Sequence, residues 1–183
     1  MVNAVEQVRQ RLLLASKTLT ANGVAYAVVG GNAVAAWVAT VDQAAVRNTQ
    51  DVDILIRRSD FAAAKAALES VGFIHRHAAK LDLFLDNATA SPRSAVHFIY
   101  ANEIVRPGEP AANPDVAESS EIGGFRVLNL EALVRIKLTA FRDKDRTHLR
   151  DLIDIGLIDQ SWTDRLPAAL SPRLQQLLDT PGG

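Results

Sequence analysis

The chain has 183 residues, of which 48% are hydrophobic, and its formal net charge at pH 7 is −1. This length and composition fit one domain with a hydrophobic core, and the near-neutral charge excludes a global field that would attract nucleic acid or an anionic membrane. The absence of cysteine excludes a disulfide scaffold, a thiolate metal site and a cysteine nucleophile. Charges interrupt the N-terminal apolar run and no other run is long enough to span a membrane, so we expect a cytoplasmic protein.

Apolar residues at helical spacing predict an amphipathic helix over residues 3–21, followed by a short strand over 24–30. A helix over 32–41 should follow, with Asn32 as its N-cap. A second strand is expected at 51–56 and a helix at 59–72, with Ser59 as N-cap and Gly72 just past the C-terminal end. Three more strands are expected at 73–77, 81–86 and 95–101.

The second half of the chain is expected to be mainly helical. Prolines, glycines and acidic residues over 102–124 indicate a surface loop, which leads into a strand at 125–129. Helices should follow at 130–142 and 144–155, with Gly156 as a stop, and two further short helices in the tail. This order predicts an α+β fold with a small mixed sheet flanked by helices, in which 1–129 form the core and 130–183 a helical extension packed on it.

Two aspartates stand where the second predicted strand begins, in the stretch "RNTQDVDILI". Side chains alternate along a strand, so Asp51 and Asp53 should share a face and repel each other. A divalent cation would cancel that repulsion, and Mg²⁺ is commonly held by one or two carboxylates plus substrate phosphates. A solvent-facing pair or a turn cap is the alternative; a calcium site is disfavoured because no acid-rich loop follows.

A Gly-Gly pair upstream, in "VVGGNAV", separates a predicted strand from a predicted helix. Gly30 and Gly31 would let the backbone approach a ligand closely, and the helix N-terminus would offer free N–H groups to a phosphate. The alternative is a tight strand-to-helix turn that binds nothing. A phosphate-binding turn followed by a carboxylate pair is more specific than either motif alone.

Together, "VGGNAVAAW" and "RNTQDVDILI" resemble the nucleotidyltransferase superfamily of the DNA polymerase β type. More narrowly, they resemble small bacterial members related to minimal nucleotidyltransferases and to abortive-infection toxins. The family signature, a Gly-Gly or Gly-Ser turn and then [Ser/Thr]-x-Asp-x-Asp, corresponds here to Gly30, Gly31, Thr49, Asp51 and Asp53. The resemblance extends over roughly residues 20–155 and implies a nucleotidyltransferase-type sheet.

The resemblance also implies an activity. The two aspartates would bind Mg²⁺ or Mn²⁺, the glycine turn with Asn32 and Thr49 would hold a nucleoside triphosphate, and a nucleotidyl group would pass to an acceptor hydroxyl as pyrophosphate leaves. The acceptor, whether a protein, an RNA end or a small molecule, is not specified. A toxin role with a cognate antitoxin partner is a further implication, whereas membrane association and stable DNA binding are not expected.

The family pattern places a third carboxylate on a later strand, and here His97 occupies that position. A neutral imidazole can bind Mn²⁺ or Zn²⁺ and accept a proton, but it is a poor Mg²⁺ ligand. The alternative for His97 is a strand histidine with a hydrogen bond and no catalytic task, and Asp82 or Asp86 could supply the oxygen if the strands align differently. The alternative function is therefore a degenerate module that binds a nucleotide or a partner without transfer.

Several basic residues are phosphate candidates. Lys137 lies on or beside the apolar stripe of the helix at 130–142, so its side chain must either snorkel to solvent or meet an anion, and the resemblance implies nucleotide phosphates. The charged run from Arg142 to Asp151 favours helix ends with intrahelical pairing, with Asp143 as a cap, and Lys144 is its phosphate candidate. Arg47 could clamp a phosphate or pair with an acid.

Two other interpretations are weaker. The alternation His75, Arg76, His77 could be a metal site, but two histidines without a third ligand indicate a solvated sheet edge. RNA binding through the Arg-rich helices at 130–155 is disfavoured by the near-neutral charge and by an aromatic content of only 5%.

Overall fold

A computed structural model describes residues 3–181 of the chain. Within this range six α-helices and seven strands form an α+β fold, which confirms the predicted fold class. The helices are α1 (Ala4–Ala21), α2 (Gly30–Ala39), α3 (Phe61–Ser70), α4 (Leu130–Ala140), α5 (Asp143–Asp154) and α6 (Ser171–Asp179). The strands are β1 (Tyr26–Val28), β2 (Val52–Ile56), β3 (Ile74–Ala78), β4 (Leu81–Leu85), β5 (Val96–Tyr100), β6 (Ser119–Ile122) and β7 (Phe125–Leu128).

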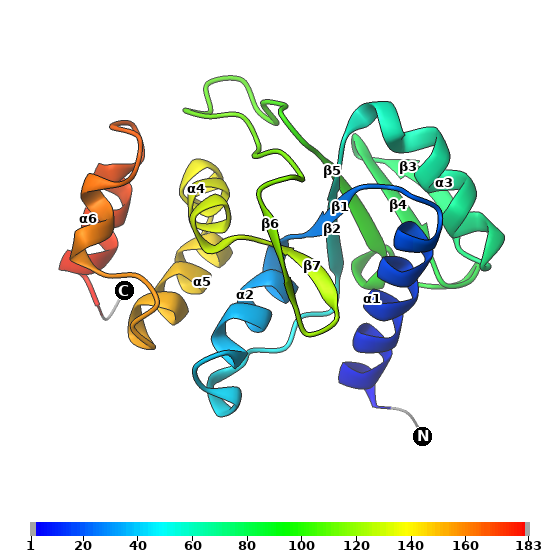
Figure 1. The fold of residues 1–183 in the computed structure, drawn as a ribbon, viewed down its shortest axis with the longest axis horizontal. Helices are drawn as coiled ribbons and strands as arrows, with labels where there is room; N and C mark the ends of the chain where they lie inside the picture. Colours follow the sequence, from blue (N-terminus) through cyan, green and yellow to red (C-terminus); the bar gives the residue numbers. More distant parts are fainter. Residues whose placement is uncertain (1–2, 182–183) are drawn as a thin grey trace.

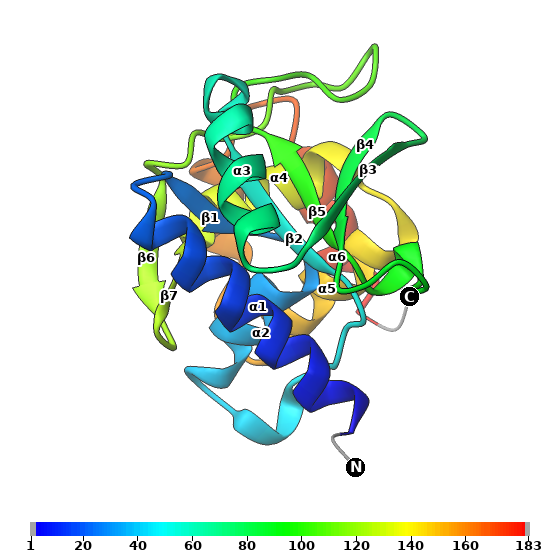
Figure 2. The same ribbon diagram turned by 90° about the vertical axis from the view of Figure 1, so that its right-hand side faces the viewer.

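The strands form one mixed sheet in the order β3-β4-β5-β2-β1-β7-β6. The pairs β2–β5 and β1–β7 are parallel, and the other neighbours are antiparallel. Helices α1 and α3 cover one face, while α2, α4 and α5 lie on the other (Figure 1, Figure 2). In the second view α1 and α3 lie in front of the sheet, with α4, α5 and α6 behind it (Figure 2). The two faces therefore have different neighbours, which decides which side chains can share a site.

Helix starts differ from the prediction at two places. Helix α2 begins at Gly30 after the N-cap Val29, so Asn32 lies inside the helix and is not its cap. Helix α3 begins at Phe61 after a 3₁₀ turn at Arg58–Asp60, and no side chain caps it, so the prediction for Ser59 was wrong. By contrast, Asn3 caps α1 and Asn129 caps α4 by accepting first-turn N–H groups.

The predicted loop at 102–124 is ordered by ion pairs to the end of β2. Arg57 contacts Asp115 with N–O distances of 3.1 and 2.6 Å, and Arg58 binds Glu103. The last part of this segment is strand β6, which the sequence analysis missed because "SSEI" lacks an apolar alternation and lies at the sheet edge, paired only with β7.

One hydrophobic core continues from the sheet into the C-terminal helices. Ile54 and Val28 in the sheet belong to the same buried cluster as Leu138, Leu149 and Leu174 in α4, α5 and α6. In addition, Arg173 of α6 donates to the carbonyl oxygens of Leu138 and Thr139 at 2.6 and 2.8 Å, which satisfies two C-terminal carbonyls of α4. None of the helices formed by residues 3–181 combines the length and the apolar character needed to cross a bilayer.

Candidate active site

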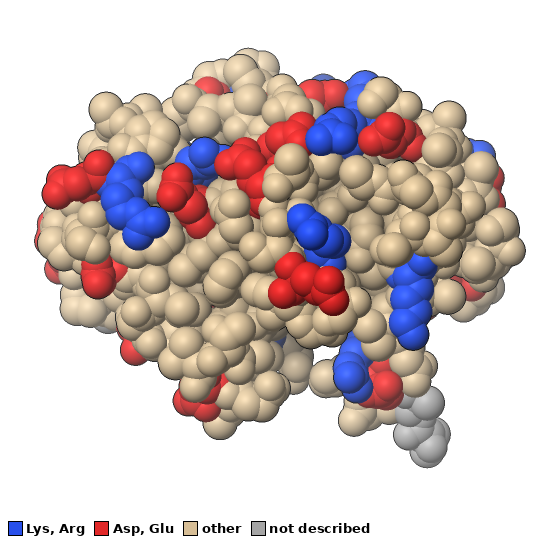
Figure 3. Space-filling view, viewed as in Figure 1, with Lys and Arg blue, Asp and Glu red and all other residues tan. Residues whose placement is uncertain are grey.

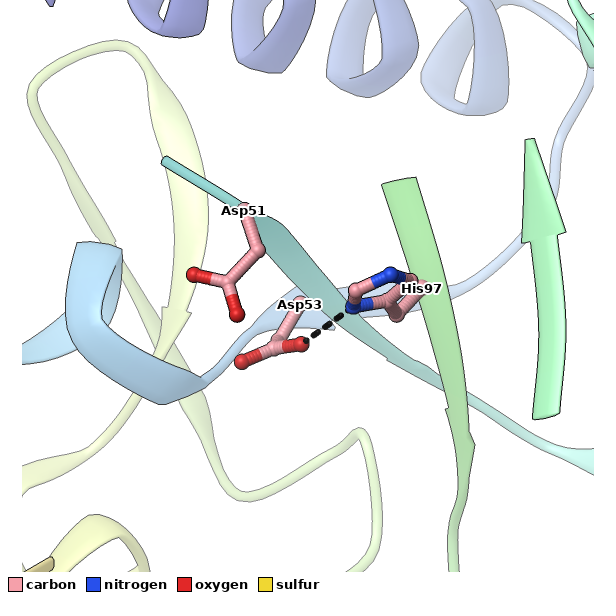
Figure 4. Close-up of side chains that lie close together, drawn as sticks. All are labelled: Asp51, Asp53 and His97. Atoms are coloured by element: carbon pink, nitrogen blue, oxygen red, sulfur yellow. Dashed lines mark ion pairs between the residues drawn. The ribbon is translucent and has the colours of Figure 1, made fainter. Parts of the chain in front are cut away.

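The parallel pairing of β2 and β5 brings Asp53 and His97 side by side. The two residues are register partners, so their side chains lie on the same face of the sheet. Nδ1 of His97 lies 3.4 Å from Oδ1 of Asp53, and the two side chains are only 16% and 14% exposed, respectively. Asp51, one residue before β2, points to the same place (Figure 4). One ligand atom from each of the three residues lies within 4.8 Å of the others.

Neighbouring polar groups fix the position of Asp51. The hydroxyl of Thr49 donates to its carboxylate, and Nδ2 of Asn32 donates to its backbone oxygen at 2.7 Å. Both residues were phosphate candidates. In the structure Asn32 joins the first turn of α2 to the start of β2, and Thr49 orients the Asp51 carboxylate.

Gly30 allows α2 to begin directly against Asp53. Its φ is +65°, in the left-handed region, and a Cβ built there would lie 2.1 Å from Oδ2 of Asp53. The backbone oxygen of Asp53 accepts a 2.9 Å hydrogen bond from the N–H of Val29, which fixes this approach. A Cβ on Gly31 would come within 3.1 Å of the Thr49 side chain. Only glycine fits at position 30, and the uncapped N-terminus of α2 faces the carboxylates.

The hydrogen bonds of His97 define which ring nitrogen is available. Nε2 lies 2.9 Å from the carbonyl oxygen of Pro92, which can only accept, so Nε2 carries the proton. Nδ1 then faces the carboxylates. The hydrogen bond to Asp53 raises the pKa of His97 most strongly, against burial, with help from the Pro92 carbonyl. In the neutral ring, Nδ1 presents its lone pair to the same point as Asp51 and Asp53.

Asp53 remains ionised despite its position. Burial raises its pKa, but the hydrogen bond with His97 and the positive charges of His97, Lys144 and Lys137 outweigh burial, so the pKa is lowered overall. The site therefore holds an anionic carboxylate at neutral pH.

Lys137 lies in a buried network between α4 and α5. It does not snorkel to solvent: the residue is 4% exposed, and Nζ lies 3.2 Å from Oδ1 of Asp145 and 3.0 Å from Nδ1 of His148. Burial lowers the pKa of Lys137 against the attraction of Asp145. Burial and the Lys137 charge lower the pKa of His148 to about 4, so this imidazole is neutral and accepts from Lys137.

The charged run at the start of α5 is only partly solvated. Arg142 is the N-cap, and Asp145 accepts its backbone N–H at 3.2 Å and its Nε at 2.7 Å, so the prediction that Asp143 caps this helix was wrong. Lys144 is exposed in the first turn, close enough for its charge to act on Asp53. Arg47 pairs with Asp151 of α5 at 2.9 Å, which makes the phosphate-clamp interpretation the weaker one.

The alternative third ligands face away from the site. Asp82 is the register partner of Phe98, one residue from His97, and its carboxylate binds His75, His77 and Tyr100 on the opposite face. Asp86 is paired with Arg11 of α1. The proposal that either aspartate replaces the missing carboxylate was wrong, because strand alternation turns both to the face that α1 and α3 cover.

The same contacts explain the two histidines of β3. Nε2 of His75 and Nδ1 of His77 lie 2.9 and 3.0 Å from one oxygen of Asp82. Among residues 3–181 these three residues do not bring their ligand atoms together as Asp51, Asp53 and His97 do. The histidines of this edge strand are therefore hydrogen-bonded to an acid, not arranged around an ion.

Two hollows lie along β5, and His97 lines one of them. One, of about 440 Å³, is lined by Asp51, His97, Leu83 and Arg93. The other, of about 260 Å³, is enclosed by the ends of β5 and α4 and by the loop after β5, and its walls include Ile99, Ile136, Ile104, Val105 and Arg142. The first is called the His97 hollow below, and the second the α4 hollow.

Sequence reasoning missed His148 and the role of Asp145. Asp145 appeared only within a charged run, and nothing in the sequence distinguishes a lysine bound by a facing helix from a lysine that snorkels. The spacing of Lys137, Asp145 and His148 places them on consecutive helices, so only the packing of α4 on α5 brings them together.

No protein-family model matches the sequence, and no curated protein matches it either. Solved structures do share the fold. The antibiotic-resistance factor ANT(2'')-Ia has a TM-score of 0.56 at 16% identity over 93% of this chain and 92% of that chain. A protein from H. pylori described as a nucleotidyltransferase has a TM-score of 0.55 at 14% identity, over 99% of this chain and 79% of that one. An antigenic nucleotidyltransferase-like protein from Paracoccidioides brasiliensis has a TM-score of 0.54 at 19% identity, over 96% and 92%.

Proposed function

Because this chain has the nucleotidyltransferase fold, we propose that it is a metal-dependent nucleotidyltransferase. It would move a nucleoside monophosphate from a nucleoside triphosphate to an acceptor hydroxyl. The observation that carries the proposal is the convergence of Asp51, Asp53 and His97 beside the glycine turn of α2. A carboxylate pair next to an uncapped helix N-terminus suits a cation and the phosphates it accompanies.

The donor set fits a divalent cation. Two ionisable carboxylates and one imidazole nitrogen lie within 4.8 Å of one another, and hydrogen bonds to Thr49 and Pro92 orient two of the three side chains. When bound there, Mn²⁺ or Mg²⁺ would neutralise negative charge on the phosphates and lower the pKa of a bound hydroxyl. The imidazole favours Mn²⁺ over Mg²⁺, which prefers oxygen ligands.

The chain's own residues would hold the triphosphate on the side of Asp53 that faces α2. There the N–H groups of Gly30 and Gly31 and the exposed ammonium of Lys144 lie near the carboxylates, and the buried ammonium of Lys137 adds positive charge. Asp145 and His148 would keep Lys137 in place. The apolar walls of the α4 hollow, Ile99 and Ile136, suit a nucleobase.

A toxin role with a cognate antitoxin belongs to this proposal as a cellular setting, and the resemblance of the glycine and aspartate motifs is its only support. The degenerate alternative, a module that binds nucleotide without transfer, is favoured by one feature, the imidazole at the position of the third carboxylate. The two functions differ in one measurable step, the transfer of the nucleotidyl group to an acceptor.

The test uses the purified chain with each α-labelled nucleoside triphosphate, with Mg²⁺ and separately with Mn²⁺, and with cell extract as a source of acceptors. We expect label to pass to a protein, an RNA or a small molecule, and the labelled species identifies the acceptor. Metal-dependent nucleotide binding without transfer would instead establish the degenerate module. Absence of both binding and transfer would overturn the proposal.

A change of His97 to aspartate should alter the metal requirement. His97→Asp restores a third oxygen ligand, so we expect the ratio of Mg²⁺-supported to Mn²⁺-supported transfer to rise by about tenfold or more. Initial rates over a titration of each metal measure this ratio.

His77→Asp is the matched control, because His77 lies on the edge strand and contacts Asp82 on the other face. This variant should leave the metal preference unchanged. An unaltered preference in His97→Asp would contradict the assignment of His97 as a metal ligand.

A further inference from the structure

The two oxygens of Asp53 face different parts of the site. Oδ2 lies against Gly30 at the start of α2, where the phosphates are proposed to bind, and Oδ1 faces Nδ1 of His97 on β5. Figure 4 shows this division, with α2 on one side of Asp53 and His97 on the other. An acceptor that approaches from the side opposite the phosphates must therefore come through the His97 hollow.

The His97 hollow joins the site to the end of the β3–β4 hairpin. Asp51 and His97 form its inner wall, and Ala78, Leu81, Leu83 and Pro92 make most of the rest apolar. Its volume of about 440 Å³ lies within the range of small-molecule sites, roughly 300–1,000 Å³. The hollow therefore suits a small acceptor with an apolar portion.

One cation lines this hollow and two more lie next to wall residues of it. Arg93 lines it. Arg76 is the register partner of Leu83, which is a wall residue of the hollow and the register partner of His97. Arg76 therefore lies on the same face of the sheet as His97. Lys80 is at the tip of the hairpin, next to Leu81, which both hollows share. All three residues are exposed.

None of the three cations forms an ion pair within residues 3–181. Of the acids nearby, Asp51 lines the hollow and is assigned to the metal ion, and Glu109 lines the α4 hollow with Lys80. Asp53 pairs with His97, Glu103 pairs with Arg58, Asp86 pairs with Arg11, and Asp82 lies on the opposite face. Among the contacts of residues 3–181, Arg76 donates only to the backbone oxygen of His75. The outer rim thus carries three cations without an ion-pair partner among the described residues, whereas the acid of the hollow, Asp51, lies at its inner wall.

The hairpin tip is also strained. Ala79 and Lys80 connect β3 and β4 with φ of +51° and +65°, although this type of turn strongly prefers Asn and Gly. Left-handed conformations are unfavourable for non-glycine residues. Lys80 in this unfavourable conformation places an ammonium group at the rim. The glycine that such a turn prefers would carry no charge there.

We propose that the acceptor is a small alcohol that carries a phosphate group, and that Arg76 and Arg93, with Lys80, bind this phosphate. The inference rests on the proposed function. In the transfer step, the acceptor hydroxyl oxygen forms a bond to the α-phosphorus, and the bond from that phosphorus to the bridging oxygen breaks. Pyrophosphate leaves with the electron pair, and the hydroxyl proton passes to solvent. No other bond of the acceptor changes.

A small acceptor is favoured over an RNA by the charge distribution of the protein. On the face shown in Figure 3, which carries β6 and β7 and lies away from the β3–β4 hairpin, acidic and basic side chains are interspersed and form no continuous basic stripe. The net charge is −1 as well. A polynucleotide needs an extended basic track, whereas three cations around a hollow suit one phosphate group.

The test compares ribose 5-phosphate with ribose by calorimetric titration into the full chain saturated with Mn²⁺ and a non-hydrolysable nucleotide analogue. We expect ribose 5-phosphate to bind at least about tenfold more tightly, since hydrogen bonds between ions are stronger than neutral ones. The double variant Arg76→Gln, Arg93→Gln should reduce this advantage to about twofold or less. Arg9→Gln with Lys17→Gln is the control; it removes two exposed cations from α1 on the other face and should preserve the advantage.

Equal binding of ribose and ribose 5-phosphate would overturn the inference, as would an advantage that survives in the Arg76, Arg93 variant. Tighter binding of a five-nucleotide RNA than of ribose 5-phosphate would also overturn it, in favour of a nucleic-acid acceptor. The first stage of the titration tests the proposed function separately. If the analogue does not bind in the presence of Mn²⁺, the proposed function is wrong. The two sugars are then compared without the analogue, so the preference is still measured.

Discussion

Asp53→Asn is expected to reduce nucleotidyl transfer by a factor on the order of 10³, comparable to removal of a key electrostatic group from an active site. Asparagine keeps the shape of the side chain but loses the charge that faces both His97 and the start of α2. The carboxylate is ionised at neutral pH because its pKa is lowered by His97 and the nearby lysines. Single-turnover rates at saturating Mn²⁺, together with the Mn²⁺ dissociation constant, measure the effect.

Asp60→Asn is a suitable control, because Asp60 follows β2 at its opposite end and its side chain caps no helix N–H group. We expect this variant to transfer at the wild-type rate. A rate for Asp53→Asn within a few-fold of the wild type would show that the carboxylate pair is not part of the reacting centre. Thermal unfolding of both variants establishes that each is folded when assayed.

Gly30→Ala should damage both the fold and the site. The left-handed φ of +65° costs a non-glycine residue roughly 1–2 kcal/mol of folding free energy. In addition, the new Cβ would lie 2.1 Å from Oδ2 of Asp53, so the carboxylate must move. Because a displacement of about 1 Å can cost a factor of about 10², we expect transfer to fall by roughly that amount.

Gly23→Ala separates the two effects. Gly23 has nearly the same φ, +68°, but no atom lies within 4 Å of a Cβ built there. This control should therefore lose a similar amount of stability in urea unfolding and retain full transfer. Equal transfer rates in the two alanine variants would contradict the proposal that Gly30 positions Asp53.

The central part of the site was predictable because it depends on local patterns. Alternation along β2 places Asp51 and Asp53 together, and the family resemblance, matched by the order of the strands, identified His97 as the residue at the third position. The structure adds the register, in which Asp53 and His97 are direct partners. The glycine turn was predicted as well, although the contact of Gly30 with Asp53 depends on where β1 and β2 pair.

The remainder depends on tertiary packing. Whether Asp82 faces the site is decided by its register with Phe98, and one residue of slip would reverse the answer. Likewise, Asn32 is a good cap by type, but the helix begins two residues earlier because Gly30 permits the turn there. The partners of Lys137 come from α5, and no local signal in α4 indicates them.

The composition of the metal centre is tested most directly by electron paramagnetic resonance of bound Mn²⁺ in the presence of a non-hydrolysable nucleotide analogue. With ¹⁵N-labelled histidine, we predict one tightly bound ion with a hyperfine coupling to a single imidazole nitrogen. The coupling should disappear in His97→Asp while the ion stays bound, and binding should be lost in the Asp51→Asn, Asp53→Asn double variant. Absence of a bound ion in the wild type, or a bound ion whose spectrum is the same in all three proteins, would contradict the assignment of Asp51, Asp53 and His97 as the metal centre.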